Sequence, residues 1–163
     1  MVMARLVRVG ALILAIGCAG EPAAPPPPET AHFAVLGDRT GEPDDRLWRA
    51  TVAEVAALSP DRVLTVGDLA DDPTDLADWA RAMEPLKTLP MPIDYVPGNH
   101  DIIDEATARN FELQTGQAPY RAFDALGVHF VVVDNSVADS WEELPEAQRT
   151  WLEADLAVAR DLP

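Results

Sequence analysis

Beyond the N-terminal segment, short apolar runs alternate with longer amphipathic stretches. Two stretches, 46–58 and 75–86, place apolar side chains at helical spacing. They separate three mostly apolar runs that are typical of buried strands, namely 32–37 (HFAVLG), 62–67 (RVLTVG) and 92–98 (PIDYVPG). These units recur at intervals of about 30 residues, which is the length of a β–α–β unit. The pattern therefore predicts an α/β protein in which helices cover the faces of a sheet.

The second half of the chain has a different rhythm. Two apolar runs, 120–124 and 128–134, are joined by Ala125-Leu126-Gly127, which predicts an antiparallel hairpin. Residues 145–160 again show helical spacing, and Pro145 suits the first turn of that helix.

Residues 1–17 are typical of a secretory signal peptide. Two arginines precede a short apolar stretch, 9–17, which is too short to span a membrane. The sequence LAIGC that ends at Cys18 resembles the cleavage box of bacterial lipoproteins, in which the Cys thiol takes the lipid. The alternative is an ordinary signal peptide with an incidental Cys. We expect an exported protein of the bacterial cell envelope, either lipid-anchored or periplasmic.

Residues 18–30 predict a linker between this signal and the folded domain. They contain the run Pro25-Pro26-Pro27-Pro28, and such runs adopt an extended polyproline II conformation. We therefore expect one folded domain over residues 31–163.

The composition and net charge exclude several classes of binding partner and site. The chain has 28 acidic and 12 basic residues and a formal net charge of −16, so no nucleic-acid-binding surface is expected. Its single Cys excludes a disulfide framework and a cluster of thiolate ligands. Membrane contact is expected only through a lipid on Cys18, because an acidic surface repels anionic headgroups.

The three predicted parallel strands all end in Gly followed by a polar residue. Asp38, Asp68 and Asn99 follow these glycines directly. Ligands of open α/β sheets bind beyond the carboxyl ends of the strands, so the three side chains are expected at one edge. Two carboxylates and an amide oxygen suit divalent metals. A Gly-Asp pair taken alone after a strand is most often a turn or a helix cap.

The loops themselves carry a family resemblance. The sequences Gly37-Asp38-Arg39-Thr40-Gly41, Gly67-Asp68-Leu69-Ala70-Asp71 and Gly98-Asn99-His100-Asp101 resemble motifs of the calcineurin-like metallophosphoesterase superfamily. The resemblance covers residues 31–163. It implies a four-layer α/β/β/α sandwich and hydrolysis of phosphate mono- or diesters by a dinuclear metal centre.

The resemblance also implies a role for each residue. Asp38 would bind the first metal ion, Asp68 would bridge both ions, and Asn99 would bind the second. His100 would be the general acid, and Asp71 would orient its imidazole. Two divalent ions such as Mn, Fe or Zn are expected, because a bridging carboxylate holds ions about 3.5–4 Å apart and a shared water becomes acidic there.

Some positions depart from the family pattern. Thr40 replaces a His that usually binds the first metal, and Asp72 stands where related protein phosphatases have a phosphate-binding Arg. Arg39 is then either a phosphate contact or a solvated loop residue. His32 and His129 lie in predicted strands and are interpreted as structural residues rather than as ligands.

The late His motifs of the family are absent from the sequence. We therefore expect an incomplete sandwich from the N-terminal part of a longer enzyme, with weak metal binding, poor turnover, an open sheet edge and an uncovered apolar face. One alternative is a non-catalytic lipoprotein domain that keeps the fold. Another is a module that binds a single metal ion through Asp38, Asp68 and Asn99.

Overall fold

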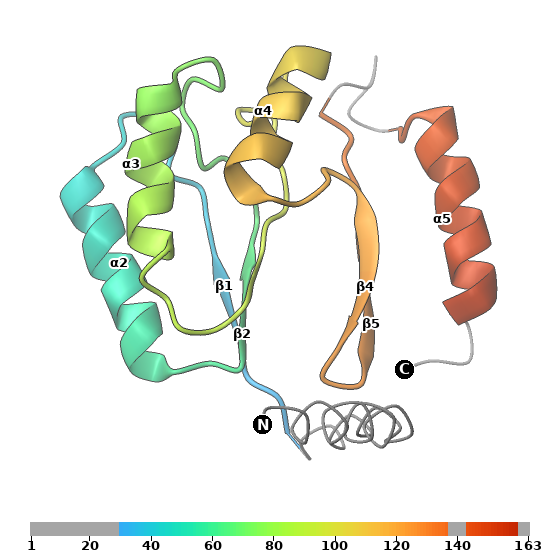
Figure 1. Cartoon of the computed structure of the whole chain (residues 1–163), viewed down its shortest axis with the longest axis horizontal. Helices are drawn as coiled ribbons and strands as arrows, with labels where there is room; N and C mark the ends of the chain where they lie inside the picture. The colour runs from blue at the N-terminus through green and yellow to red at the C-terminus, as the bar shows by residue number, and fades with distance from the viewer. Residues whose placement is uncertain (1–29, 137–142, 160–163) are drawn as a thin grey trace, which may run out of the picture.

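A computed structural model describes residues 30–136 and 143–159 of the chain (Figure 1). The predicted signal peptide, Cys18 and all but the last residue of the predicted linker lie outside the described residues.

The first three strands form a parallel sheet, as the alternation predicts. They are β1 (Phe33–Leu36), β2 (Arg62–Thr65) and β3 (Ile93–Asp94), in the order β1-β2-β3. Phe33 pairs with Arg62, and Val63 pairs with Ile93. Each strand is shorter than predicted, because the residues that precede each candidate ligand already belong to the loops.

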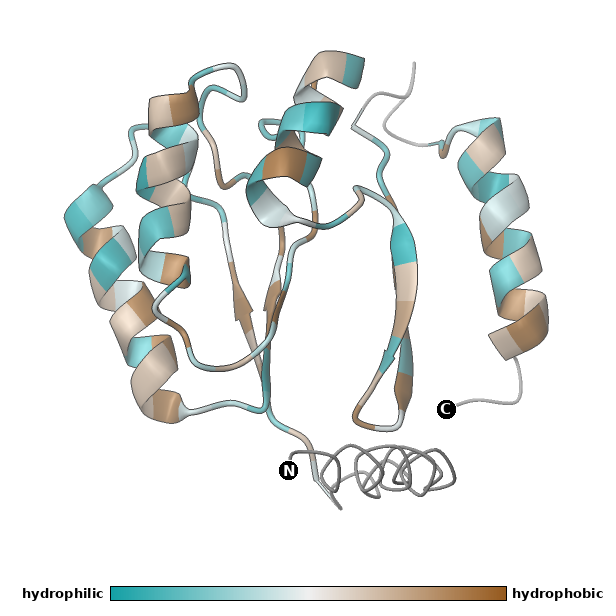
Figure 2. Ribbon diagram, in the orientation of Figure 1, coloured by the Kyte–Doolittle hydropathy of each residue, from teal (hydrophilic) through white to brown (hydrophobic). Residues whose placement is uncertain are grey.

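Helices α2 (Asp45–Leu58) and α3 (Leu76–Leu86) cover one face of this sheet (Figure 1). Asp44 and Asp75 cap their N-termini by accepting hydrogen bonds from main-chain N–H groups. The core lies between the helices and the sheet and includes Val52, Val63, Trp79 and Leu86. Figure 2 shows β1 and β2 coloured mainly as hydrophobic, whereas the helices alternate between hydrophobic and hydrophilic bands.

A hairpin lies against the other face of the parallel sheet. Strands β4 (Arg121–Ala125) and β5 (Val128–Val132) pair antiparallel, as predicted. The turn residues Leu126 and Gly127 have φ angles of 53° and 79°, which suit a tight hairpin turn. Phe130 packs on Phe33 of β1 with ring centroids 5.5 Å apart, so the hairpin contacts the sheet directly.

Helix α5 (Glu146–Ala159) packs on the outer side of the hairpin. Trp151 of this helix meets Tyr120 edge to face, with ring centroids 5.2 Å apart. Helix α4 (Glu105–Thr115) follows the third strand-end loop and was not predicted from the sequence. Its N-terminus is fixed by a capping box between Asp104 and Thr107.

The part of the chain that the structure describes is thus mixed α/β, with one parallel and one antiparallel sheet. Within residues 30–136 and 143–159, no helix combines the length and apolarity needed to cross a bilayer. Val35 of β1 is 65% exposed and Val66, just beyond β2, is 57% exposed. Apolar side chains on β1 and just beyond β2 are therefore uncovered.

Candidate metal centre

The loops that carry Asp38 and Asp68 are hydrogen-bonded to each other through their main chains. The N–H of Asp38 donates to the carbonyl oxygen of Gly67 at 3.0 Å, and the N–H of Arg39 donates to that of Asp68 at 2.8 Å. Both loops follow neighbouring parallel strands. The two acidic residues therefore lie at the same edge of the sheet.

The main chain is strained at both acidic residues. Asp38 has a φ of 59° and Asp68 a φ of 55°, values that place both residues in the left-handed region. Such residues cost on the order of 1 kcal/mol or more each, and they cluster at functional sites. The hydrogen bonds between the loops hold this conformation.

The third loop meets Asp68 from the other side. The N–H of His100 donates to Oδ1 of Asp68 at 3.0 Å. A Cβ on Gly98 would lie 2.1 Å from the same oxygen, and one on Gly67 would lie 2.4 Å from the nitrogen of Gly98. Only glycine fits at these two positions, which explains the Gly-Asp and Gly-Asn pairs in physical terms.

Asp101 joins the second and third loops from beneath. Its side chain is completely buried, and Oδ1 accepts hydrogen bonds from the N–H groups of Leu69 and Ala70 at 2.9 and 3.0 Å. Its Oδ2 accepts from the N–H of Gly98 at 2.9 Å. Burial raises the pKa of the carboxyl to about 6, against the opposing effect of these amide hydrogen bonds. Sequence reasoning assigned Asp101 no role, although it is the last residue of the third motif.

His100 and Asp71 approach each other, but through the main chain of Asp71. The Nδ1 atom of His100 lies 3.4 Å from the carbonyl oxygen of Asp71, and the imidazole is exposed. The carboxylate of Asp71 instead accepts a hydrogen bond from the N–H of Gly41 at 2.9 Å. The imidazole of His100 therefore faces the carbonyl oxygen of Asp71, whereas the carboxylate of Asp71 connects the first two loops.

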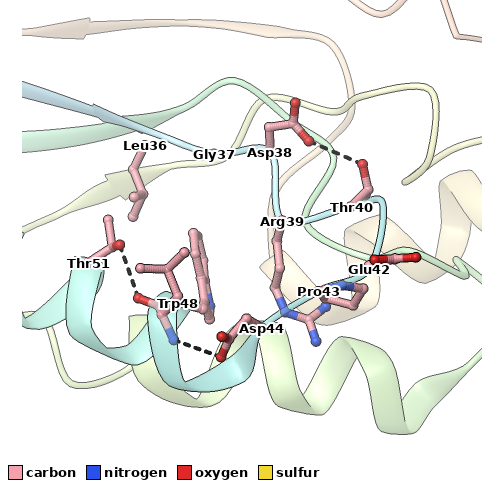
Figure 3. Close-up of a pocket in the computed structure, with 11 residues that line it drawn as sticks. Leu36, Gly37, Asp38, Arg39, Thr40, Glu42, Pro43, Asp44, Trp48 and Thr51 are labelled. Carbon is pink, nitrogen blue, oxygen red and sulfur yellow. Dashed lines mark hydrogen bonds between the residues drawn. The ribbon is translucent and has the colours of Figure 1, made fainter.

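Thr40, which replaces the usual His, lies beside Asp38. Its hydroxyl donates to Oδ1 of Asp38 at 3.1 Å. In Figure 3 the Asp38 carboxylate points away from α2, whereas the Arg39 side chain runs toward the start of that helix. A cavity of about 240 Å³ lies on the α2 side and is lined in part by Leu36, Trp48 and Asp38 to Thr40. The cavity therefore borders the first strand-end loop, and Asp38 contributes to its lining.

Arg39 is neither a phosphate contact nor a solvated loop residue, the two alternatives that the sequence left open. The residue is only 5% exposed, so it is not a solvated loop residue and cannot present its charge to a phosphate. Its guanidinium donates to Oδ1 of Asp78 at 2.8 Å, to the carbonyl of Leu69 at 3.2 Å and to Oδ1 of Asp45 at 2.8 Å. Burial works to lower the pKa of Arg39, but the hydrogen bonds to Asp45 and Asp78 outweigh it and raise the pKa.

The loop after β5 also reaches the candidate centre, which the sequence did not indicate. The hydroxyl of Ser136 donates to the carbonyl of Gly98 at 3.3 Å. Two residues earlier, the main chain of Asp134 exchanges two hydrogen bonds with the buried side chain of Gln148 in α5. Helix α5 therefore fixes a loop that supports the third motif.

The other two histidines lie apart from this edge in contacts of their own. His32 is exposed beside Asp61, with 3.5 Å between Nδ1 and Oδ2. His129 lies between two carboxylates, with Asp124 2.6 Å from Nδ1 and Asp155 2.9 Å from Nε2. Neither histidine therefore lies with the candidate ligands of the strand-end loops.

The oxygen donors at this edge fit a divalent cation by their chemistry. Asp38 and Asn99 are exposed, and Asp68 is partly exposed. Within residues 30–136 and 143–159, no three His, Cys, Asp or Glu side chains gather as a metal site. That result is expected for a set with only two carboxylates, because Asn99 would have to supply the third protein ligand. Carboxylate and amide oxygens are the ligands of hard and borderline divalent ions.

The stretch of sequence that contains these loops matches a known protein family. Residues 30–154 match the sequence model named Metallophos, described as calcineurin-like phosphoesterase. A search of curated proteins finds no match to the chain. The matched stretch contains all three strand-end loops and covers more than half of the chain. The chain therefore belongs to the calcineurin-like phosphoesterase family.

Proposed function

We propose that the chain is a metal-dependent hydrolase of phosphate mono- or diesters, with a dinuclear centre of divalent ions. The family supports phosphoesterase chemistry in general and the use of divalent metals. The observation that carries the proposal is the hydrogen bond from the N–H of His100 to the Asp68 carboxylate. It brings the candidate general acid beside the candidate bridging ligand.

Asp38, Asp68 and Asn99 would hold the ions through side-chain oxygens. Bound divalent ions would neutralise charge on the phosphoryl oxygens and make a nearby water more acidic. Hydrogen bonds between the loops hold the strained main chain of Asp38 and Asp68, which would reduce the cost of ordering the ligands when ions bind.

His100 would deliver a proton to the departing oxygen of the substrate. A proton on Nδ1 faces the carbonyl of Asp71, which leaves Nε2 to face the substrate. The imidazole is exposed, so a substrate can reach it. A general acid must carry a proton on Nε2 as well, and only the imidazolium has N–H groups at both ring nitrogens.

The change His100→Asn tests this role in the full chain. For phosphoesters of alkyl alcohols, whose oxygen leaves only when protonated, we expect kcat to fall about 10²- to 10⁴-fold. For 4-nitrophenyl esters the loss should be much smaller, and the bound metal measured by elemental analysis should be unchanged. The exposed residue His32 offers a control, because His32→Asn should leave both rates unaltered. Equal turnover of alkyl esters by the wild type and His100→Asn would refute the assignment.

A second candidate is a binding domain of the same fold that does not catalyse hydrolysis. The observation that favours it is Thr40, whose hydroxyl contacts Asp38 where the family usually supplies a His ligand. The same assays separate the two candidates. Binding of Mn²⁺ without turnover of any phosphoester, in the presence of Mn²⁺, Zn²⁺ or Fe²⁺, would favour the binding domain.

We also propose a four-layer α/β/β/α arrangement and export as a lipoprotein. The four-layer arrangement is supported by the succession of α2 and α3, the parallel sheet, the hairpin and α5 in Figure 1.

Export as a lipoprotein is supported by the lipoprotein-type sequence that ends at Cys18. In bacterial cells the full chain should fractionate with membranes, and Cys18→Ser should release it. Unchanged fractionation of the variant would contradict lipid attachment.

A further inference from the structure

A buried ion pair lies directly behind the candidate metal centre. Arg39 and Asp78 have side chains that are 2% and 4% exposed, and they are joined at 2.8 Å. Arg39 follows the candidate ligand Asp38 in the chain, and Asp78 lies in the first turn of α3. The pair therefore connects the first strand-end loop to a helix on the face of the sheet.

Each partner also holds the second strand-end loop. Oδ2 of Asp78 accepts hydrogen bonds from the N–H groups of Asp71 and Asp72 at 2.6 and 3.3 Å. Arg39 donates to the carbonyl of Leu69 at 3.2 Å. In the loop that begins with Asp68, Arg39 thus binds the main chain before Ala70, and Asp78 binds it after Ala70.

Stability alone does not account for this arrangement. The desolvation cost of a buried ion pair is commonly as large as the attraction gained, and apolar residues of similar volume often serve stability equally well. The Nε atom of Arg39 is buried without a hydrogen-bond partner, which adds to the cost. What the charges provide, and apolar residues do not, is a fixed direction for the main-chain groups of two loops.

We propose that the Arg39–Asp78 ion pair is a positioning device that sets the metal affinity of the candidate centre. It fixes the loops of Asp38 and Asp68 relative to each other and touches neither metal nor substrate. This inference rests on the proposed function. Neighbours of metal ligands that orient them typically change metal affinity about 10- to 100-fold when removed.

The main test is the double change Arg39→Met with Asp78→Leu in the full chain. Replacing both charges by apolar residues leaves no buried charge unpaired, so the melting temperature should stay close to that of the wild type. The dissociation constant for Mn²⁺, measured by calorimetry, should rise about 10- to 100-fold. A folded double variant that binds Mn²⁺ as tightly as the wild type would overturn the proposal.

A single change provides a second test in case the double variant does not fold. Asp78→Asn keeps the shape of the side chain and loses its charge, so Mn²⁺ binding should weaken by several-fold. In the metal-free chain, the N–H of Asp71 should exchange with solvent faster, because it donates to this carboxylate. If neither quantity changes, the positioning role is wrong.

Arg81→Met provides the matched control. Arg81 contacts the same Oδ1 atom of Asp78 at 3.1 Å, but its side chain is 45% exposed. The carboxylates near it, those of Asp45, Asp75 and Asp78, lie outside the strand-end loops. Its removal should change the Mn²⁺ dissociation constant less than twofold. An effect as large as that of the double variant would point to general electrostatics and contradict the proposal.

The wild type separates this inference from the proposed function. If the wild type binds Mn²⁺, the variants bind it more weakly and none hydrolyses a phosphoester, the positioning role stands and the hydrolase assignment fails. If the wild type binds no Mn²⁺, the metal centre fails, and the positioning role fails with it.

Discussion

At the scale of single residues, the candidate centre depends on close approach between loops. Gly98 is the tightest point, because a Cβ there would lie 2.1 Å from Oδ1 and 2.5 Å from the main-chain nitrogen of Asp68. Rotation of the Asp68 side chain relieves the first contact but not the second. A larger residue at position 98 must therefore move the main chain of a candidate bridging ligand.

Gly98→Ala should consequently lower both stability and metal affinity. Overpacking of this kind costs about 1–3 kcal/mol in the free energy of unfolding, and Mn²⁺ binding should weaken about tenfold or more. Urea unfolding and calorimetry measure the two effects.

Gly116→Ala is the appropriate control for that variant. Gly116 has a φ of 71° at the end of α4, but a Cβ there would have no atom within 4 Å. Alanine should cost about 1–2 kcal/mol from backbone conformation alone and leave Mn²⁺ affinity unchanged. Equal Mn²⁺ affinities for both variants would show that the contact between Gly98 and Asp68 does not matter to the centre.

At the scale of elements, apolar periodicity predicted most of the fold. The three parallel strands, the hairpin and helices α2, α3 and α5 all appear, with ends that differ by a few residues. Helix α4 was missed because only Thr107 and Phe111 are buried along it. Two buried positions four residues apart give a weak helical pattern, and the helix owes its start to the capping box at Asp104.

Only those residues of the candidate centre that directly follow a parallel strand could be predicted from the sequence. Gly-Asp and Gly-Asn pairs after apolar runs indicated Asp38, Asp68 and Asn99, because the carboxyl ends of parallel strands share one edge. The supporting residues Arg39 and Asp78 gave no such signal. They lie 39 positions apart, and their pairing depends on how α3 packs against the sheet.

At the scale of the whole molecule, polar clusters bind the layers together. Between the parallel sheet and the hairpin, Asp94 of β3 is 6% exposed and lies 2.8 Å from Arg62 of β2 and 3.7 Å from Arg121 of β4. Burial raises the pKa of Asp94, while the two arginines oppose that change. Both guanidinium groups also lie over the ring of Phe123. The contact between the sheet and the hairpin therefore combines ion pairs with cation–π interactions.

Between the hairpin and α5, the corresponding contact is His129. Its Nδ1 faces Asp124 of β4 and its Nε2 faces Asp155 of α5. A neutral imidazole has one N–H group and can donate to only one of these carboxylates, whereas the imidazolium donates to both. Hydrogen bonds to Asp155 and Asp124 accordingly raise the pKa of His129 above its usual value.

The attachment of α5 should therefore weaken as pH rises. Because the pKa is raised on folding, the stabilising contribution of His129 is fully present below the unfolded value of about 6.5 and is lost as pH rises through the folded value. Urea unfolding of the wild type between about pH 6 and pH 9 should show this loss. His129→Gln, which cannot take up a proton in this pH range, should show a smaller decline, and so should Asp155→Asn. Since α5 also holds the loop of Asp134 and Ser136 against Gly98, the protection of amide groups near Gly98, taken relative to the exchange rate of an unstructured chain at each pH, should fall over the same pH range in the wild type. Parallel stability profiles for the wild type and His129→Gln would show that protonation of His129 does not hold the two layers together.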